Sequence, residues 1–271
     1  MPIVPVDDPL DARLHDFHAV PDPVLLRRRG LFVAESRFVV RELLAHPRLA
    51  ARSLLATPAA LASLRDLLDD RTLDTLPVYV APPPVLKQIT GFRVHRGCLA
   101  IGEPPPPATD ADLPALADAR LVVVLEQVGN PDNLGSIFRN AAAFGAGCVL
   151  LSPGCCDPLY RKAIRTSIGA TLRIPYGEIP DWPDGLDRLR LHGYATVALA
   201  PDRDADDLQT LAAAPPSRLA LVFGAEGAGL SDDAVTSIDR RVRIPIAEGV
   251  DSLNVATAAG IALYALSAGP R

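Results

Sequence analysis

The chain has 271 residues, 49% of them apolar, and a formal net charge of −5. This length allows one large domain or two modest ones with an ample core, and the acidic balance excludes a uniformly basic nucleic-acid coat. No apolar run reaches the roughly 18 residues that a membrane span needs, and the N-terminal text lacks the basic-then-apolar pattern of a signal peptide. We therefore expect a soluble cytoplasmic protein.

Short apolar stretches follow one another through the first segment of the chain, residues 1–104. They are LFVAES, RFVVRELLAH, RSLLAT, PAALASLRDLLDD, PVYVAP and GCLAIG. Alternation of short strands and helices of this kind predicts a small α/β domain. Any RNA contact on an acidic chain has to use a local basic patch, and the run Arg27, Arg28 and Arg29 is one candidate.

A proline-rich run, GEPPPPATDADLP at 102–114, divides the chain. Consecutive prolines favour an extended polyproline conformation and exclude a helix. We expect a linker over residues 105–117 and a second domain over 118–271.

Strands and helices alternate more clearly in the second segment. Near-continuous apolar strands separated by helices predict a parallel sheet covered on both faces. The strands are expected at 121–125, 147–152, 171–175, 195–200, 218–223 and 242–246, and the helices at 133–144, 158–168, 184–192 and 252–267.

The sequence lacks the motifs of several common classes of enzyme. There is no G-x-x-x-x-G-K-[ST] phosphate loop, no G-x-G-x-x-G after the first strand of the second segment, and no G-x-S-x-G elbow. The four cysteines form no C-x-x-C pair, so we predict no metal site.

Three polar clusters remain, each after an expected strand, where open α/β sheets bind their ligands. They are NPDNLGSIFRNAAAFG (130–145), LVFGAEGAGLS (221–231) and IPIAEGVDSLNVATAAG (244–260). Asn133 can cap the first helix, and Ser252 or Asp251 the last. Gly224 allows a close approach of the backbone to a ligand. Taken singly, each cluster could equally be a cap or a flexible turn.

Taken in order, the clusters resemble a known family. The sequence N-x-G-x-x-x-R-N-A (133–141), then F-G-A-E-G-x-G-L-S (223–231), then I-P-I…G-x-x-S-L-N-V-A (244–256) is similar to the three motifs of the SpoU (TrmH) RNA ribose 2′-O-methyltransferases of the SPOUT superfamily. The stretch that carries Arg165 also resembles the central part of this family. Residues 31–44 and 88–104 resemble, less specifically, the L30e-like domain often fused ahead of it.

The resemblance implies an α/β fold whose C-terminal parallel-sheet domain contains a deep trefoil knot, preceded by a small L30e-like domain. It also implies a homodimer, S-adenosyl-L-methionine as cofactor and RNA as substrate, with no metal. By position in the motifs, Arg139, Asn133, Glu226, Ser252 and Asn254 would be catalytic, and the cofactor would lie on Leu199 or Ala200, Gly224, Ile244 and Leu253.

The RNA contacts and the target stay open. Arg165, His95 and Arg96 are candidate RNA contacts, although His95-Arg96-Gly97 could equally be a turn entering a strand. The extra N-terminal domain favours 23S ribosomal RNA. The alternatives are a transfer-RNA methyltransferase and a catalytically silent RNA-binding protein of the same fold. An unrelated nucleotide-dependent enzyme is opposed by the missing phosphate loops.

Overall fold

A computed structural model describes residues 3–18, 22–68, 75–91, 94–104, 119–202 and 204–267. The chain forms two compact units, one of residues 1–107 together with 158–173, the other of residues 108–157 and 174–271. The whole of the expected linker, 105–117, lies outside the described residues. No described helix is long and apolar enough to cross a bilayer.

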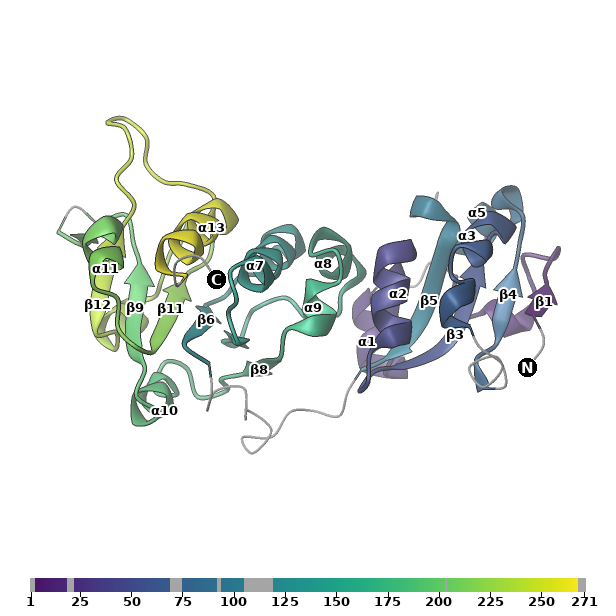
Figure 1. Ribbon diagram of the computed structural model, residues 1–271, viewed down its shortest axis with the longest axis horizontal. Helices are drawn as coiled ribbons and strands as arrows, with labels where there is room; N and C mark the ends of the chain where they lie inside the picture. The colour runs from purple at the N-terminus through teal and green to yellow at the C-terminus, as the bar shows by residue number, and fades with distance from the viewer. Residues whose placement is uncertain are drawn as a thin grey trace. The chain divides into compact units, whose positions relative to one another are not determined.

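The first unit is built on a mixed five-stranded sheet in the order β1-β4-β3-β5-β2 (Figure 1). Strands β1, β4 and β3 run parallel, and β5 runs antiparallel to both β3 and β2. The strands are β1 (Ile3–Pro5), β2 (Phe32–Glu35), β3 (Ala50–Ala56), β4 (Val78–Val80) and β5 (Cys98–Glu103). Its helices are α1 (Asp22–Arg29), α2 (Arg37–Ala45), α3 (Pro58–Ala62), α5 (Pro83–Thr90), α8 (Arg161–Thr166) and α9 (Ala170–Arg173), with 3₁₀ turns η1 (Ala12–Leu14), η2 (Arg65–Leu67) and η3 (His95–Gly97).

Residues 158–173 also belong to this unit. The Asp22 carboxylate accepts a hydrogen bond from the Arg161 backbone N–H at 3.0 Å. The strand expected at 171–175 is wrong, because α9 occupies Ala170–Arg173 and the next strand begins at Tyr176. Gly169, with a φ of +79°, reverses the chain, and the Ser167 hydroxyl accepts from the Thr171 N–H at 3.4 Å, which starts a new helical turn where an apolar run suggested a strand.

The second unit is a seven-stranded sheet in the order β10-β12-β9-β11-β6-β7-β8, and every pairing in it is parallel. This confirms the parallel α/β sheet. The strands are β6 (Leu121–Leu125), β7 (Cys148–Leu151), β8 (Tyr176–Glu178), β9 (Ala195–Leu199), β10 (Asp206–Asp207), β11 (Leu219–Phe223) and β12 (Arg240–Arg243). Residues Ile244 to Ile246, expected in the last strand, lie beyond it, since Pro245 has no N–H to continue the ladder.

Helices cover both faces of this sheet. Alternate residues of β6, β7 and β11 pack with α10 in one apolar cluster, and the other residues of these strands are also buried. Helix α13 packs against α7 and α11. The helices are α7 (Pro131–Ala143), α10 (Leu186–Leu191), α11 (Leu208–Ala213), α12 (Asp232–Thr236) and α13 (Val255–Leu266); α11 and α12 were not expected from the sequence.

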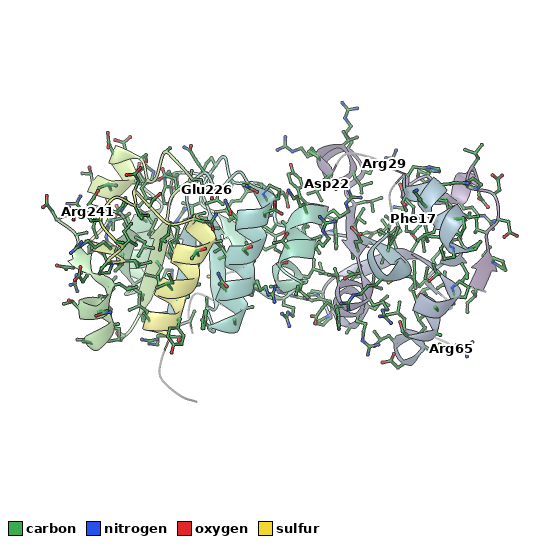
Figure 2. The ribbon with its side chains drawn as sticks, turned by 90° about the horizontal axis from the view of Figure 1, so that it is seen from above. Phe17, Asp22, Arg29, Arg65, Glu226 and Arg241 are labelled. Atoms are coloured by element: carbon green, nitrogen blue, oxygen red, sulfur yellow. The ribbon has the colours of Figure 1, made fainter. Side chains whose placement is uncertain are left out.

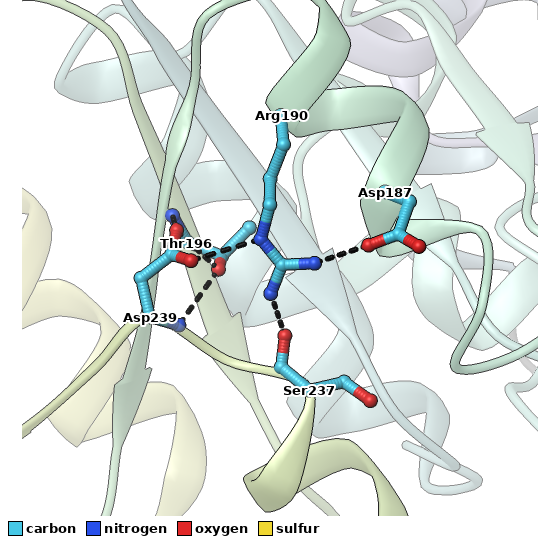
Figure 3. A network of polar contacts seen from close by, with 5 residues as sticks. All are labelled: Asp187, Arg190, Thr196, Ser237 and Asp239. Carbon is cyan, nitrogen blue, oxygen red and sulfur yellow. Dashed lines mark hydrogen bonds and ion pairs between the residues drawn. The ribbon is translucent and has the colours of Figure 1, made fainter.

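A polar network joins the starts of β9 and β12 (Figure 3). The Asp239 carboxylate accepts from the backbone N–H and the hydroxyl of Thr196, both at 2.8 Å, and the Asp239 N–H donates back to that hydroxyl at 3.0 Å. Arg190 of α10 donates to Asp239, to the Ser237 carbonyl and to Asp187. Thr196 is fully buried. The network therefore fixes the register of β12 before the chain enters the segment that follows Arg243.

The network also perturbs the acidity of Asp239. Burial alone would raise the pKa of Asp239, but the hydrogen bonds from Thr196 and the guanidinium of Arg190 outweigh it and hold the pKa below its usual 3.8. A carboxyl whose pKa is lowered by folding stabilises the protein above its unfolded pKa, and this contribution is lost as pH falls through the folded pKa.

We expect Thr196→Val to lower the free energy of unfolding by about 1–3 kcal/mol, because the Asp239 N–H and carboxylate lose a buried partner. The destabilisation should shrink as pH falls below 3.8, where the carboxyl is neutral in the unfolded chain. Urea unfolding followed by the fluorescence of Trp182, the single tryptophan and a residue of this unit, measures it. Thr236→Val, at an exposed hydroxyl on α12, is the matched control. Equal effects from both variants would contradict the expectation.

Candidate functional site

A cavity of about 420 Å³ lies at the carboxyl ends of β9, β11 and β12. This is the edge at which parallel sheets place their ligands. Its walls are the end of β9, the glycine-rich loop after β11, the segment 244–254 and the start of α13. The lining residues are Leu199, Ala200, Pro201, Phe223, Gly224, Ala225, Glu226, Gly227, Gly229, Ile244, Ile246, Ser252, Leu253, Asn254, Val255 and Ala258. All five residues expected at a cofactor therefore line a single cavity.

The glycine-rich loop is closed by its own backbone. Ala225 and Gly229 exchange two backbone hydrogen bonds, of 3.1 and 3.0 Å, so that the chain turns tightly over Glu226 to Ala228. A Cβ at Gly224 would lie 2.2 Å from the backbone of Gly229. The reason for glycine at position 224 thus differs from the one expected from the sequence. A side chain there would collide with the other limb of the loop before it filled any ligand space.

Asn254 connects three parts of the site. Its Oδ1 accepts from the backbone N–H groups of Ala256 and Thr257 at 3.0 and 3.2 Å, which makes it the N-cap of α13. The cap expected at Ser252 or Asp251 is therefore wrong. The Nδ2 of Asn254 donates to the Asn133 Oδ1 at 3.0 Å and to the Glu226 Oε1.

The three motifs thus meet in one hydrogen-bonded chain, Asn133–Asn254–Glu226. Asn133 is buried inside the first turn of α7 and does not cap it, because the Asn130 side chain accepts from the Asp132 N–H and is the N-cap. Glu226 projects from the glycine-rich loop in the second unit (Figure 2). Because Asn254 needs both amide atoms for these contacts, its orientation is fixed.

The other two expected catalytic residues, Ser252 and Arg139, lie outside the hydrogen-bonded chain Asn133–Asn254–Glu226. Ser252 is exposed and lines the cavity, in the long segment between β12 and α13 (Figure 1). Arg139 lies on the exposed side of α7 and is not among the residues that line the cavity. A groove between α7 and α13 adjoins the cavity through Asn254 and is floored by Asn140, Phe144, Ile261 and Tyr264, among others.

A further residue of this site, Glu126, was missed by sequence reasoning. It is only 2% exposed, at the carboxyl end of β6. Its Oε1 accepts from the Trp182 Nε1 and the Ser231 hydroxyl, both at 2.6 Å, and its Oε2 accepts from the Ser231 N–H at 2.9 Å. Ser231 ends the glycine-rich loop and caps α12. A carboxylate directly after five apolar strand residues was the signal that could have identified it.

The candidate RNA-contacting residues of the first unit are spread over several elements. Arg27, Arg28 and Arg29 are exposed in the last turn of α1, and Arg29 donates to Asp16 at 3.0 Å (Figure 2). Arg165 on α8 lies 3.8 Å from the buried Glu35. Arg96 is exposed in the turn before β5, and the side chain of His95 lies outside the described residues.

The arrangement suits an organic ligand held mainly by backbone and apolar groups. Among the described residues, no group of three His, Cys, Asp or Glu side chains could hold a metal ion. Polar atoms of Glu226, Ser252 and Asn254 gather in the cavity wall. The cavity can therefore bind a ligand with an apolar body and offer oriented hydrogen-bonding groups to a reacting partner.

Comparison with known proteins finds relatives of this chain among RNA methyltransferases. An uncharacterized tRNA/rRNA methyltransferase of Mycobacterium bovis is 42% identical over 96% of this chain and 90% of its own length. The 23S rRNA (guanosine-2′-O-)-methyltransferase RlmB of Acinetobacter baylyi is 30% identical over 66% of this chain and 73% of its own.

Two solved structures are similar over almost the whole chain. A TrmH-family RNA methyltransferase structure from Porphyromonas gingivalis has a TM-score of 0.75 and 26% identity, covering 95% of this chain and 98% of that one. The SpoU methyltransferase AviRb of Streptomyces viridochromogenes, in complex with AdoMet, has a TM-score of 0.77 and 25% identity, covering 95% and 98%. The model of the SpoU rRNA Methylase family matches residues 120–264. This chain belongs to the SpoU rRNA Methylase family.

Proposed function

We propose that the protein transfers a methyl group from S-adenosyl-L-methionine to a ribose 2′-hydroxyl of RNA, with 23S ribosomal RNA as the substrate. The observation that carries the proposal is the hydrogen-bonded chain Asn133–Asn254–Glu226 beside the 420 Å³ cavity. It joins the three motifs on which the family resemblance rests. The 2′-hydroxyl specificity is also supported by the RlmB relative, a guanosine-2′-O-methyltransferase of 23S rRNA.

The cavity fits this cofactor in size and chemistry. Ligand pockets commonly hold about 300–1,000 Å³ and are mostly apolar with a few placed polar groups. Leu199, Ile244 and Leu253 supply apolar surface, and Gly227 and Gly229 of the glycine-rich loop are exposed in the cavity wall. The backbone of Gly224, Ile244 and Leu253 would hold the donor, with Leu199 and Ala200 against it.

S-adenosylmethionine, when bound, supplies a methyl group on a positively charged sulfur, so that no metal is needed to activate the leaving group. The ribose hydroxyl is a weak nucleophile, and the chain has to orient it and stabilise the charge that develops as its proton leaves. Asn254 holds the Glu226 carboxylate and the Asn133 amide in fixed positions at the cavity. Ser252, exposed on the same wall, is placed to contact the incoming ribose.

Arg139 would act as an electrostatic group. Arginine is effectively always protonated in proteins, so orientation of an RNA phosphate and stabilisation of the oxyanion suit it better than proton abstraction. Its place on the exposed side of α7, off the cavity wall, fits an active site completed by a second subunit.

The first unit would bind the RNA. We assign residues 1–104 of this unit to the L30e-like class as the substrate-binding domain. Residues 118–271 are assigned to the methyltransferase domain, of which the segment 158–173 packs within the first unit. The C-terminal part of the chain would thread through a loop to form the trefoil knot, to which the loop 223–229 and the stretch 244–255 would both belong. A transfer-RNA target or a catalytically silent RNA-binding protein are the competing assignments.

Two measurements test the proposal. Calorimetry with S-adenosylmethionine should give one site per chain, and labelled methyl groups should pass to purified ribosomal RNA and not to transfer RNA. Mapping of 2′-O-methyl positions in ribosomal RNA from a deletion strain identifies the nucleotide. Cofactor binding without transfer to any RNA would favour the silent protein, and transfer to a base would exclude the 2′-hydroxyl.

A homodimer through α13 and α7 is the second part of the proposal. On α13, Val255, Ala259, Ala262 and other residues are buried within the chain, whereas Ile261 is 39% and Tyr264 72% exposed. Tyr264 meets Phe144 of the α7 C-terminus edge-to-face at 5.8 Å. Exposed apolar side chains on α13, next to the half-buried Phe144 that follows α7, are typical of an interface. Because Ala262 is buried in the core of its own chain, it cannot contribute to the dimer contact. The proposed dimer contact on α13 consists of the exposed residues Thr257, Ile261 and Tyr264.

The first prediction from the proposed function concerns Arg139. Because lysine cannot offer the planar fork of a guanidinium, Arg139→Lys should lower single-turnover methyl transfer at least about a hundredfold, the scale for loss of one oxyanion donor. The affinity for S-adenosylmethionine should change little. Arg188→Lys, at an exposed arginine of α10, is the control. Near-normal turnover of Arg139→Lys would exclude it as a catalytic residue.

The second prediction concerns Glu126. Glu126→Gln replaces one acceptor oxygen by a donor, so that Ser231 or Trp182 loses its partner. The exit of the glycine-rich loop should loosen and the cofactor Kd should rise roughly tenfold, within the range for a hydrogen bond to a charged group. Calorimetry gives the Kd, and Trp182 fluorescence reports the local change. Glu178→Gln, exposed at the end of β8, should alter neither quantity. An unchanged Kd would remove Glu126 from the support of this loop.

The third prediction concerns the dimer. Ile261→Glu combined with Tyr264→Glu places charges on the proposed contact without disturbing the buried side of α13. Sedimentation at micromolar concentration should show a dimer for the unmodified protein and a monomer for the variant, with methyl transfer lost. Leu191→Glu, at an exposed apolar residue of α10, should stay dimeric. An unmodified protein that sediments as a monomer refutes the dimer.

A further inference from the structure

One aromatic side chain of the first unit is exposed where its helix begins. Phe38 lies in the first turn of α2 and is 54% exposed, while Val39, Val40 and Leu43 of the same helix are buried. The Arg96 guanidinium lies over its ring, with the central carbon 4.6 Å from the ring centroid. An exposed aromatic ring paired with a guanidinium is a surface of the kind that stacks nucleobases.

The backbone holds both side chains in place. Arg96 has a left-handed backbone, with φ +60° and ψ +16°, in the turn before β5. Gly97 follows with φ +74°, and its carbonyl accepts from the Thr57 N–H at 2.8 Å. Ser36, the residue before α2, has φ +93°, and its N–H donates to the Cys98 carbonyl at 3.2 Å. A positive φ thus occurs at Arg96 itself and at Ser36, two residues before Phe38, and such backbone strain persists only where the surrounding structure fixes it.

The surroundings carry an excess of positive charge. Arg37, next to Phe38, acts electrostatically on Cys98, which adjoins the Arg96 turn. Arg165 lies 3.8 Å from Glu35, whose carboxylate is buried. Glu42 of α2 lies 3.6 Å from Arg173, and Asp66 of η2 accepts from Arg41 at 2.8 Å. Each of these three carboxylates has an arginine beside it, which favours the approach of an anionic strand.

We propose that Phe38 and Arg96 form a stacking platform for one unpaired base of the RNA substrate, with Arg37 and Arg165 contacting the adjoining phosphates. This inference rests on the proposed function, because it names how the first unit holds the RNA. Phe38 is the new element, since no charge pattern or motif pointed to it. A ring face accepts any base, so the platform recognises an unpaired nucleotide by its exposure more than by its sequence.

The test uses the full-length protein and a short single-stranded RNA that carries one 2-aminopurine, whose fluorescence is quenched by stacking. A fully paired RNA duplex of the same length is the comparison. Phe38→Ala should weaken binding of the single strand about tenfold and abolish the quenching, the scale for loss of one base–aromatic stack. Binding of the duplex and the Kd for S-adenosylmethionine should stay unchanged. Phe38→Trp should restore binding and quenching, which a loss of folding would not allow.

Two further variants separate stacking from charge. Phe38→Ala should leave the salt dependence of binding unaltered, whereas Arg37→Gln should reduce the slope of log K against log salt by about one. Leu10→Ala, another exposed apolar residue of this unit, is the matched control and should bind as the unmodified protein does.

The outcomes distinguish this inference from the proposed function. If Phe38→Ala binds the single strand normally while the unmodified protein methylates RNA, the platform is wrong and the function stands. If Phe38→Ala changes sedimentation and not RNA binding, the ring serves a protein contact and the platform is equally wrong. If the unmodified protein neither binds nor methylates RNA, both fail.

Discussion

The two-sided hydrogen bonding of the Asn254 amide is the constraint on which the second unit depends. Its oxygen starts α13, and its nitrogen holds Asn133 of α7 and Glu226 of the glycine-rich loop. One side chain thus sets a helix boundary and the geometry of a reaction site together. A carboxamide is the group that can do this, because it offers donors and an acceptor on one small plane.

A buried carboxylate complements this amide on the other side of the loop. Glu126 binds Ser231, just beyond the last glycine, while Asn254 binds Glu226 near the first. Glu226, Gly227 and Gly229 of the loop between them are exposed, whereas Leu230 packs against the apolar core. Polar contacts at both ends of the loop and the two backbone hydrogen bonds between Ala225 and Gly229 hold this glycine-rich segment in one conformation.

The sequence was sufficient for the parallel sheet and for the set of residues around the cavity, because long apolar strands and closely spaced motifs are local signals. The predictions from the sequence were wrong where contacts between distant residues determine the local structure. The helix at Ala170–Arg173 depends on the turn at Gly169. The cap of α13 is Asn254 and not Ser252 or Asp251, because the Asn254 Oδ1 accepts from the first N–H groups of the helix. Glu126 and Phe38 carried no motif, since their roles arise from distant partners, Ser231 and Arg96.

The ties between α13 and the start of the second unit bear on the order in which the molecule folds. The Asn140 side chain donates to the Ala256 carbonyl and Arg120 donates to the Leu266 carbonyl, across 116 and 146 residues of chain. Contacts of such separation form slowly because a long loop must close first. The Asn254 contacts that complete the wall of the cavity likewise join distant segments of the chain. Binding of the methyl donor at this cavity therefore requires that both ends of the second unit have folded.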